Sequence, residues 1–336
     1  MNDDPRAAFD AALIPGMRDR LADAYREFRA REAEAIATLA PPASGGSIGA
    51  YRDRDCPICG TPAGAARPVL QAHGLTLLDC PGCGLTYTRQ VMEEAADAGR
   101  YRASALDEAL IALRLSEPYL ELETARARYY LDRLAAQGAA GGRLLEIGSG
   151  FGTLLVEAGQ RGWQALGLEP GRLGATATRR RGATVVEGYF PQDLPDPAAR
   201  FEAIAALDVL EHMASPLPFL ADIRQRLAPG GLLFIQVPNW DSLLVRLEGA
   251  ASSVVCPGHW SYFTPATLTG LLARAGFRAL EVGTVQSEID RQAAFAPEAV
   301  AAALNQLRPG EAGVPDAARL HALKLGYKLV GVFAPG

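Results

Sequence analysis

Short apolar runs alternate with amphipathic segments from about residue 141 onward. Seven apolar runs bounded by turn-forming residues predict strands, at 143–147, 165–169, 184–187, 203–207, 232–237, 278–283 and 327–333. Segments with apolar residues at helical spacing predict helices between them, at 154–161, 216–227, 265–275, 297–307 and 315–325. Strands that alternate with helices predict a parallel sheet covered on both faces, so the expected fold class is α/β.

The amino-terminal part of the chain follows a different pattern. Residues 17–39 carry apolar side chains at helical spacing and predict one helix, which ends before a run of Pro, Gly and Ser. Composition then shifts to Cys, Pro and Gly, and residues 92–137 are again rich in Ala, Glu and Arg. These shifts predict a helix and linker (1–50), a small cysteine-rich unit (51–90), a helical connector or lid (91–140) and an α/β domain (141–336).

Four of the five cysteines form two pairs, Cys56 with Cys59 and Cys80 with Cys83. A gap of two residues lets both sulfurs of a pair bind one ion, and two pairs complete a zinc site of four thiolates. A redox motif, the alternative, would have a single pair beside a strand–helix unit. Four thiolates leave no position for water, so we expect a zinc ribbon in which the metal is structural. The fifth cysteine, Cys256, is expected to be a small buried side chain.

A glycine loop follows the first predicted parallel strand. Gly148, Gly150 and Gly152 lie between this strand and a helix, where glycine lets the backbone bend and approach a ligand. A nicotinamide oxidoreductase is the alternative, but its GxGxxG spacing is absent. Glu146, just before the loop, suits a cationic ligand better than a pyrophosphate. Glu169 ends the next strand, where its carboxylate could accept both ribose hydroxyls or could merely cap the following helix.

Four ordered motifs within residues 143–285 resemble those of class I S-adenosylmethionine-dependent methyltransferases. They are the glycine loop at 146–152, the acidic strand end at Glu169, residues 207–212 and residues 227–231. The resemblance implies a Rossmann-like sheet of seven strands whose last strand is antiparallel, and S-adenosylmethionine as cofactor. It also implies a cofactor site made of Glu146, Gly148, Gly150, Phe151, Gly152, Glu169, Pro170, Tyr189, Phe190 and Asp208. Tyr189 and Phe190 would flank adenine, and Asp208 would lie beneath the methionine part.

Methyl transfer is a displacement at an activated carbon, so the protein mainly aligns the acceptor and excludes water. A base assists when the acceptor is a hydroxyl. His212 matches a family motif position, although a histidine there also shapes the start of a helix. His259 and Tyr262 lie in a segment, 256–265, that resembles the one after the fifth strand of small-molecule and sugar methyltransferases. The catalytic candidates are therefore His259, His212 and Tyr262, whereas His321 lacks such a context and is expected to be exposed.

Composition narrows the class of acceptor. The formal net charge of −5 over 336 residues disfavours a partner bound through phosphates. No run approaches the roughly 20 apolar residues of a membrane span, and the acidic start is not a signal peptide, so we expect a cytoplasmic protein. The ribbon followed by a methyltransferase domain resembles bacterial sugar and natural-product methyltransferases. Those that methylate deoxysugars at carbon carry a further carboxyl-terminal domain that does not follow here, which favours oxygen as the acceptor atom.

We therefore expect methyl transfer to a small molecule, such as a sugar, a nucleotide-sugar or a natural-product intermediate, most often at oxygen. Three alternatives stay open: methylation at carbon or nitrogen, methylation of RNA or protein with the ribbon as a docking module, and a non-catalytic cofactor-binding protein. The helix at 17–39 could join two copies in a homodimer or pack on its own chain.

Overall fold

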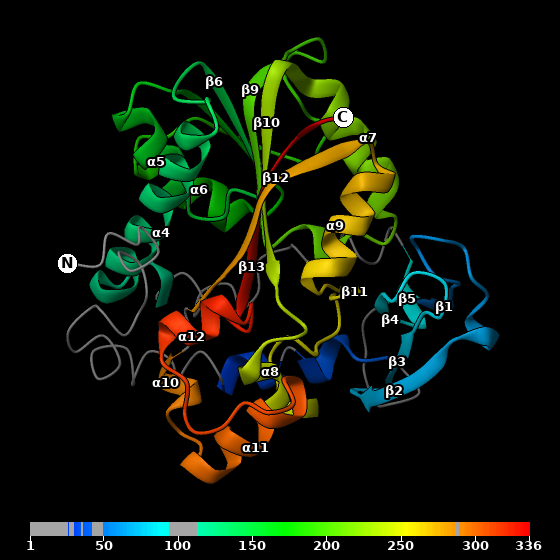
Figure 1. The fold of residues 1–336 in the computed structure, drawn as a ribbon. Helices are drawn as coiled ribbons and strands as arrows, with labels where there is room; N and C mark the ends of the chain where they lie inside the picture. Colours follow the sequence, from blue (N-terminus) through cyan, green and yellow to red (C-terminus); the bar gives the residue numbers. More distant parts are fainter. Residues whose placement is uncertain (1–25, 27–29, 35, 42–49, 94–112, 287–288) are drawn as a thin grey trace.

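The centre of the molecule is a seven-stranded sheet. The computed structural model describes residues 26, 30–34, 36–41, 50–93, 113–286 and 289–336. The strands of this sheet are β6 (Arg143–Ile147), β7 (Gln164–Glu169), β8 (Val185–Glu187), β9 (Phe201–Leu207), β10 (Leu227–Pro238), β12 (Phe277–Val285) and β13 (Lys328–Pro335). They lie in the order β12-β13-β10-β9-β6-β7-β8 (Figure 1). Strands β6 to β10 pair in parallel, whereas β13 is antiparallel to both of its neighbours. The predicted Rossmann-like fold with an antiparallel last strand is confirmed.

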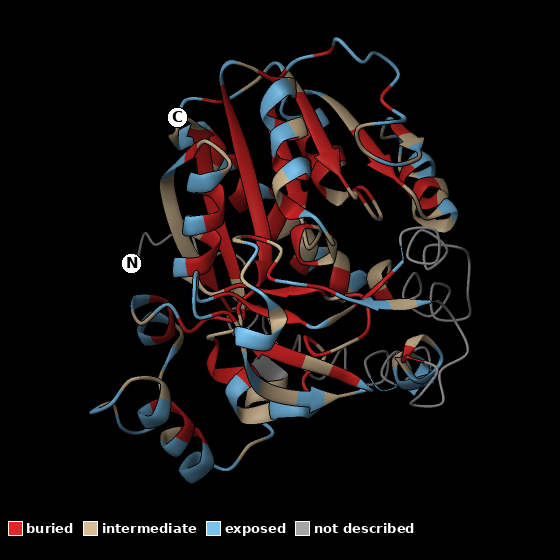
Figure 2. Cartoon of the chain, turned by 90° about the vertical axis from the view of Figure 1, so that its right-hand side faces the viewer, coloured by how far each residue is buried: buried red, intermediate tan, exposed pale blue. Residues whose placement is uncertain are grey.

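Helices cover both faces of this sheet. In Figure 1, α4 (Glu117–Ala136), α5 (Thr153–Gln160) and α6 (Arg172–Arg180) lie on one side, and α7 (Pro216–Arg226) and α9 (Pro265–Arg274) on the other. Successive residues of a strand point to opposite faces, so Leu144 packs in the cluster with α4 and α5 while Leu145 packs in the one with α7 and α9. Both faces are therefore apolar, and the central strands β6, β9, β10 and β13 are largely buried, as the red strands of Figure 2 show.

A second group of helices lies below the sheet in Figure 1. It consists of α8 (Leu243–Glu248), α10 (Ile289–Gln292), α11 (Pro297–Leu307) and α12 (Ala317–Ala322), the last three inserted between β12 and β13. The expected exposure of His321 is wrong: its side chain is 7% exposed. The cause is tertiary, because neighbouring Leu320 packs in one apolar cluster with residues of α8 and α11 and thereby holds α12 against them.

The cysteine-rich unit forms two small sheets. One pairs β1 (Tyr51–Asp53) with β5 (Gln90–Met92). The other has the order β11-β4-β3-β2, from β2 (Arg67–Ala72), β3 (Leu75–Asp79), β4 (Thr86–Thr88) and β11 (Ser261–Tyr262). Strand β11 lies far away in the sequence, after β10, and its two residues carry no strand pattern of their own. The ribbon thus shares a sheet with the α/β domain.

The predicted helices at the amino-terminal side are described only in part. Residues 30–34 and 36–39 are helical, and the remaining residues of the predicted helix at 17–39, except residue 26, lie outside the described residues. Helix α4 occupies the second half of the predicted helical region at 92–137, of which residues 94–112 also lie outside. The proposed dimer contact through 17–39 is therefore untested. Among the described residues, no helix combines the length and the apolar character that crossing a membrane requires.

The central strand β10 offers a test of the core. Leu233 is fully buried in the cluster beneath α7 and α9, so Leu233→Ala should lower the free energy of unfolding by about 3 kcal/mol. Val314→Ala is the control, because Val314 is 57% exposed and should change stability by less than about 0.5 kcal/mol. Urea unfolding monitored by circular dichroism measures both. Equal effects for the two variants would contradict this assignment of the core.

Candidate active site

The four paired cysteines converge on one point. The Sγ atoms of Cys56 and Cys83 are 3.5 Å apart, and those of Cys59 and Cys80 are 3.3 Å apart. All four sulfurs lie within 4.8 Å of one another. Four thiolates around zinc, with Zn–S bonds of about 2.3 Å, would be about 3.8 Å apart, so the cluster matches the donor set and spacing of a structural zinc site.

The two cysteine knuckles have the same backbone geometry. Gly60 and Gly84 follow the pairs at φ +72° and +76°, a conformation that favours glycine. Their N–H groups donate to the carbonyls of Cys56 and Cys80, each over 2.9 Å. This repeated turn brings each pair of sulfurs to the same side, as the spacing predicts. The fifth cysteine, Cys256, is only half-buried and lies outside the cluster.

A cleft of about 450 Å³ lies at the carboxyl edge of the parallel strands. Eight of the predicted site residues line it: Glu146, Gly148, Gly150, Phe151, Gly152, Glu169, Asp208 and His212. The loops after β6, β7 and β9 supply them because parallel strands end at the same edge of a sheet. The volume is in the range typical of small-ligand sites.

The glycine loop is held by side chains of neighbouring elements. Gly150 has φ +52°, and a Cβ added there would meet no atom within 4 Å, so the backbone faces open space. The carbonyl of Gly150 accepts a hydrogen bond from Thr178 Oγ1 over 2.9 Å. Arg181 donates to the carbonyl of Phe151 over 2.7 Å. The loop is thus braced from α6 and the residue after it, while its inner side stays open.

Glu169 joins the loops after β6 and β7. One carboxylate oxygen accepts from the N–H of Gly150 and the other from the N–H of Gly171, both over 2.7 Å. A carboxylate oxygen can accept more than one hydrogen bond, so the bonds to the two loops do not exclude a bond to a ligand hydroxyl. The two alternatives from the sequence, a helix cap and a ligand-binding carboxylate, are therefore compatible.

Asp208 lies on the floor of the cleft in a polar network. Its Oδ2 accepts from Lys328 Nζ over 2.9 Å and from Gln236 Nε2 over 3.0 Å, and Tyr130 donates to Gln236. Burial alone would raise the pKa of Asp208, but the charge and hydrogen bond of Lys328, together with the charges of Arg114 and Arg126, lower it. Burial likewise acts to lower the pKa of Lys328, but the charge and hydrogen bond of Asp208, together with the neighbouring Tyr327 and Glu211, raise it. Both groups therefore stay charged at neutral pH.

His212 and His259 face each other beside this floor. Their ring centroids are 4.6 Å apart, with the planes at 72°. Nδ1 of His212 lies 2.7 Å from the carbonyl oxygen of Gly258, and Nδ1 of His259 lies 2.8 Å from that of Val254. A carbonyl only accepts, so Nδ1 carries the proton in both neutral rings and Nε2 is the basic nitrogen.

The buried side chain of Glu211 lies against the histidine pair. One ligand atom from each of the three side chains lies within 4.8 Å of the other two. Burial, and then the negative charge of Asp208, raise the pKa of Glu211 well above its usual range. The neutral acid is therefore favoured beside the two rings.

Five predicted site residues do not line the cleft: Pro170, Tyr189, Phe190, Tyr262 and His259, the last of which faces the lining residue His212. Tyr189 is 39% exposed, whereas Phe190 packs edge-on against Phe219 with ring centroids 5.8 Å apart. Pro170 is half-buried and does not line the cleft. Tyr262 is buried with Trp240 in the apolar cluster of Leu77 and Leu244, so its position is that of a core residue.

Several cleft residues carried no recognisable motif. They are Arg114, Glu123, Arg126, Tyr130 and Gln236. Lys328, which bonds Asp208 without lining the cleft itself, carried none either. Lys328 could have been inferred from the topology: an antiparallel last strand begins at the edge where the parallel strands end, and Lys328 is its first residue. The α4 residues offered no such signal, because helical arginines and glutamates usually face solvent.

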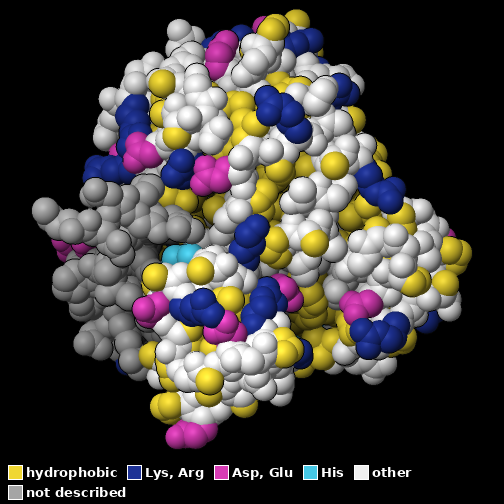
Figure 3. Space-filling view, viewed as in Figure 1, with side chains coloured by type: hydrophobic (Ala, Val, Ile, Leu, Met, Phe, Trp, Pro, Cys, Tyr) yellow, Lys and Arg dark blue, Asp and Glu magenta, His cyan; other side chains and the backbone are white. Residues whose placement is uncertain are grey.

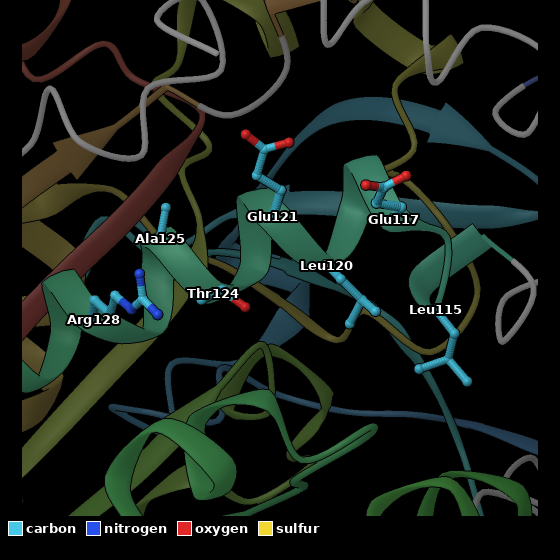
Figure 4. Close-up of a pocket in the computed structure, with 7 residues that line it drawn as sticks. All are labelled: Leu115, Glu117, Leu120, Glu121, Thr124, Ala125 and Arg128. Carbon is cyan, nitrogen blue, oxygen red and sulfur yellow. The ribbon is translucent and has the colours of Figure 1, made fainter. Parts of the chain in front are cut away.

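A second hollow, of about 590 Å³, lies along α4 (Figure 4). Its lining residues come from this helix and the turn before it: Leu115, Glu117, Leu120, Glu121, Thr124, Ala125 and Arg128. None of the predicted site residues is among them. The candidate site residues therefore line the cleft at the sheet edge and not the hollow along α4.

Comparison with known proteins agrees with the fold. Residues 119–282, just under half of the chain, match a family described as "Methyltransferase domain". The ubiquinone biosynthesis O-methyltransferase of Cereibacter sphaeroides is 27% identical over 181 residues, which are 48% of this chain and 73% of that protein. The protein of the same name from Caulobacter sp. strain K31 is 31% identical over 125 residues, 35% of this chain and 49% of that protein. The chain thus spans only about half the length of several such relatives.

Solved structures resemble the chain more weakly. A SAM-dependent methyltransferase from Archaeoglobus fulgidus has a TM-score of 0.45 and 18% identity, covering 64% of this chain and 93% of that one. One from Geobacter sulfurreducens, in complex with S-adenosyl-L-homocysteine, has a TM-score of 0.40 and 18% identity, covering 62% and 90%. TM-scores below 0.5 are too low to support an assignment, which therefore comes from the strand order and the family match. Those two findings establish that the chain carries a class I S-adenosylmethionine-dependent methyltransferase domain.

Glu146 offers a pH-dependent test of the cleft. It is buried, its Oε2 has no hydrogen-bond partner among the described residues, and burial followed by the charge of Glu169 raises its pKa well above the usual range. A carboxyl group whose pKa is raised on folding costs stability as pH rises through the unfolded pKa toward the folded one. Glu146→Gln should therefore be more stable than the parent at pH 8, and the difference should vanish near pH 4.

Thermal unfolding of the ligand-free protein across this pH range measures the effect. Glu187→Gln is the matched control, because Glu187 is exposed at the end of β8 and its substitution should change stability by less than about 0.5 kcal/mol. A Glu146→Gln variant less stable than the parent at pH 8 would show that the buried carboxylate has a stabilising partner.

Proposed function

We propose that this protein transfers the methyl group of S-adenosylmethionine to an oxygen atom of a small-molecule acceptor. The observation that carries the proposal is that one cleft joins the glycine loop with His212, which faces His259. A loop that binds the cofactor and a nearby basic nitrogen are two parts that favour methylation of a hydroxyl. The cofactor, when bound, supplies a methyl group that is activated by a positively charged sulfur.

The lining of the cleft suits this cofactor. Gly148, Gly150 and Gly152 would lie along its methionine part, since the backbone at Gly150 faces open space. The unpartnered oxygen of Glu146 is suited to the ammonium group, and the oxygens of Glu169 are suited to the ribose hydroxyls. Phe151 and Asp208 complete the proposed set. Pro170, Tyr189 and Phe190 remain predictions for the adenine side.

The histidine pair is the proposed base. Lys328 is paired with Asp208, and its raised pKa keeps the amine protonated, so it is unsuited to accept a proton. The lowered pKa of Asp208 makes its carboxylate a weak base. Nε2 of His259 or His212 would take the proton of the acceptor hydroxyl, because imidazole combines basicity with a pKa near neutrality. The burial of Tyr262 leaves the proposed proton transfer to these two rings.

Oxygen is the proposed acceptor atom, and a sugar, a nucleotide-sugar or a natural-product intermediate is the proposed acceptor class. The names of the curated relatives, which describe O-methyltransferases of ubiquinone biosynthesis, support an oxygen acceptor. Two features weigh against RNA. The net charge is −5, and Lys and Arg side chains on the face in Figure 3 are dispersed among acidic ones.

Zinc is the proposed occupant of the cysteine cluster. The spacing of four sulfurs fits a structural ion, and β11 ties the ribbon to the methyltransferase domain. A ribbon that shares a sheet with this domain suits a fixed structural support better than a separate docking module. Reduced thiols suit a reducing compartment, which supports a cytoplasmic location.

The cofactor assignment is tested by Gly150→Arg. The new side chain would extend into the cleft, so the affinity for S-adenosylhomocysteine should fall at least about 100-fold, while the zinc content stays unchanged. The control is Gly162→Arg, since Gly162 also has positive φ (+84°) and open space but lies at an exposed turn. Calorimetric titration compares the two variants. Unchanged binding in Gly150→Arg would refute the placement of the loop.

The base is tested by His212→Gln and His259→Gln. At least one of them should lower kcat by about 100-fold or more, with the affinity for S-adenosylhomocysteine unchanged within about twofold. The readout is methyl transfer to an acceptor found by screening phenols and sugar derivatives. His73→Asn is the control, because His73 is exposed in the turn after β2 at φ +50°, which Asn tolerates. Full activity in both glutamine variants would exclude the histidine pair as base.

A further inference from the structure

Arg54 connects three separate segments of the chain. It lies between β1 and the first knuckle, and its residue is only 9% exposed. Nε donates to the carbonyl of Thr88 over 3.0 Å, and Nη1 donates to that of Ala214 over 3.0 Å. Nη2 donates to the carbonyl of Trp260. One guanidinium therefore bonds β4 of the ribbon and two loops of the methyltransferase domain.

Both of these loops carry a histidine of the proposed base pair. Ala214 follows the short 3-10 helix η5 (Leu210–His212), and Trp260 directly follows His259. The two loops also bond each other, since the Trp260 N–H donates to the carbonyl of Glu211 over 2.8 Å. The bond from His212 Nδ1 to Gly258 adds a second link. A displacement of Trp260 would therefore move both rings.

Other residues of the ribbon also contact the backbone and side chain of Trp260. The N–H of Thr88 donates to the carbonyl of Trp260 over 3.1 Å, and Ser261 and Tyr262 pair with β4. The Trp260 side chain is fully buried with Val91 and Met92. The carbonyl of Trp260 thus accepts from two ribbon residues, Arg54 and Thr88, and its position depends on the fold of the ribbon.

The metal site lies next to Arg54 in the chain. Arg54 is two residues from Cys56, the first cysteine of the cluster, and its guanidinium carbon lies 5.6 Å from the ring centroid of Tyr87 in β4. A bound zinc ion would fix the first knuckle, because a structural metal contributes folding free energy to a unit this small. Metal loading and the placement of Arg54 are therefore linked through the backbone of the ribbon.

The cofactor half of the cleft has no such link. The hydrogen bonds of the glycine loop that involve described residues run to β7, α6 and the residue after it, and none reaches the ribbon. Loss of the ribbon fold should therefore leave cofactor binding in place.

We propose that Arg54 is a positioning residue that transmits the fold of the metal-loaded ribbon to the loops of His212 and His259. The acceptor half of the active site then depends on the ribbon metal, and the cofactor half does not. This inference rests on the proposed function for its effect on activity, but its structural core can be tested without turnover.

The experiment compares Arg54→Ala and Arg54→Lys with the parent. Arg54→Ala should keep its affinity for S-adenosylhomocysteine within about twofold and should shift the imidazole NMR signals of His212 and His259, leaving those of His73 and His321 in place. The signals are assigned by their loss in single His→Gln variants. Activity should fall by about 100-fold, since a displacement of roughly 1 Å has this effect. Arg54→Lys keeps the positive charge, but an ammonium group cannot donate to the same three carbonyls as the planar guanidinium. It should therefore shift the same histidine signals and lower the activity less than Arg54→Ala does.

Arg67→Ala is the matched control. Arg67 also lies on the ribbon and pairs with Asp79, but its side chain is 76% exposed and lies far from the histidine loops in sequence and contacts. This variant should behave like the parent in every measurement. Unmoved histidine signals in both Arg54 variants would overturn the proposal, and so would a matching shift in Arg67→Ala.

Metal removal from the parent protein gives a second test that needs no substitution. Chelation should shift the signals of His212 and His259 and leave S-adenosylhomocysteine binding within about twofold. Loss of cofactor binding on chelation, or unchanged histidine signals, would overturn the proposal. Shifted signals in a protein that methylates no acceptor would instead support the positioning role and count against the proposed function.

Discussion

The parallel pairing of β6 with both β7 and β9 is the constraint on which the site depends. Strands that run side by side in one direction end at one edge, so the glycine loop, Glu169 and Asp208 meet although up to about sixty residues separate them. The carboxylate of Glu169 then fixes the loop by bonding Gly150 and Gly171. Packing on both faces of the sheet holds this register, because a shift by one residue would move Leu144 and Leu145 into each other's apolar clusters, where they do not fit.

The acceptor side of the cleft is built differently. His212 ends the short 3-10 helix η5, and His259 lies on a loop. Their rings bond the carbonyls of Gly258 and Val254, and the Trp260 N–H joins the two segments, so no strand register positions them. Strand β11 anchors one of these loops to the ribbon. If the ribbon holds a metal, as proposed, it would give these loops a rigid support that the sheet does not supply. Functional loops commonly need such a scaffold.

Elements with a local signal were predictable from the sequence, and contacts between distant segments were not. The strand at 143–147 and the helix at 297–307 were predicted with the observed bounds, because the apolar pattern that defines each element lies within its own segment. The cysteine cluster followed from spacing alone. By contrast, β11 has two residues, the burial of His321 depends on the packing of α12, and Arg54 resembles any surface arginine of the sequence. Each is decided by a partner that lies far along the chain.

The central claim is that this cleft binds S-adenosylmethionine, and the most direct measurement is calorimetric titration of the metal-replete protein. S-adenosylhomocysteine, the product form of the cofactor, and NADH are titrated separately. The account predicts binding of S-adenosylhomocysteine at one site per chain and no binding of NADH. Binding of NADH alone would contradict it in favour of a nicotinamide enzyme, and binding of neither ligand would show that the cleft is not a cofactor site.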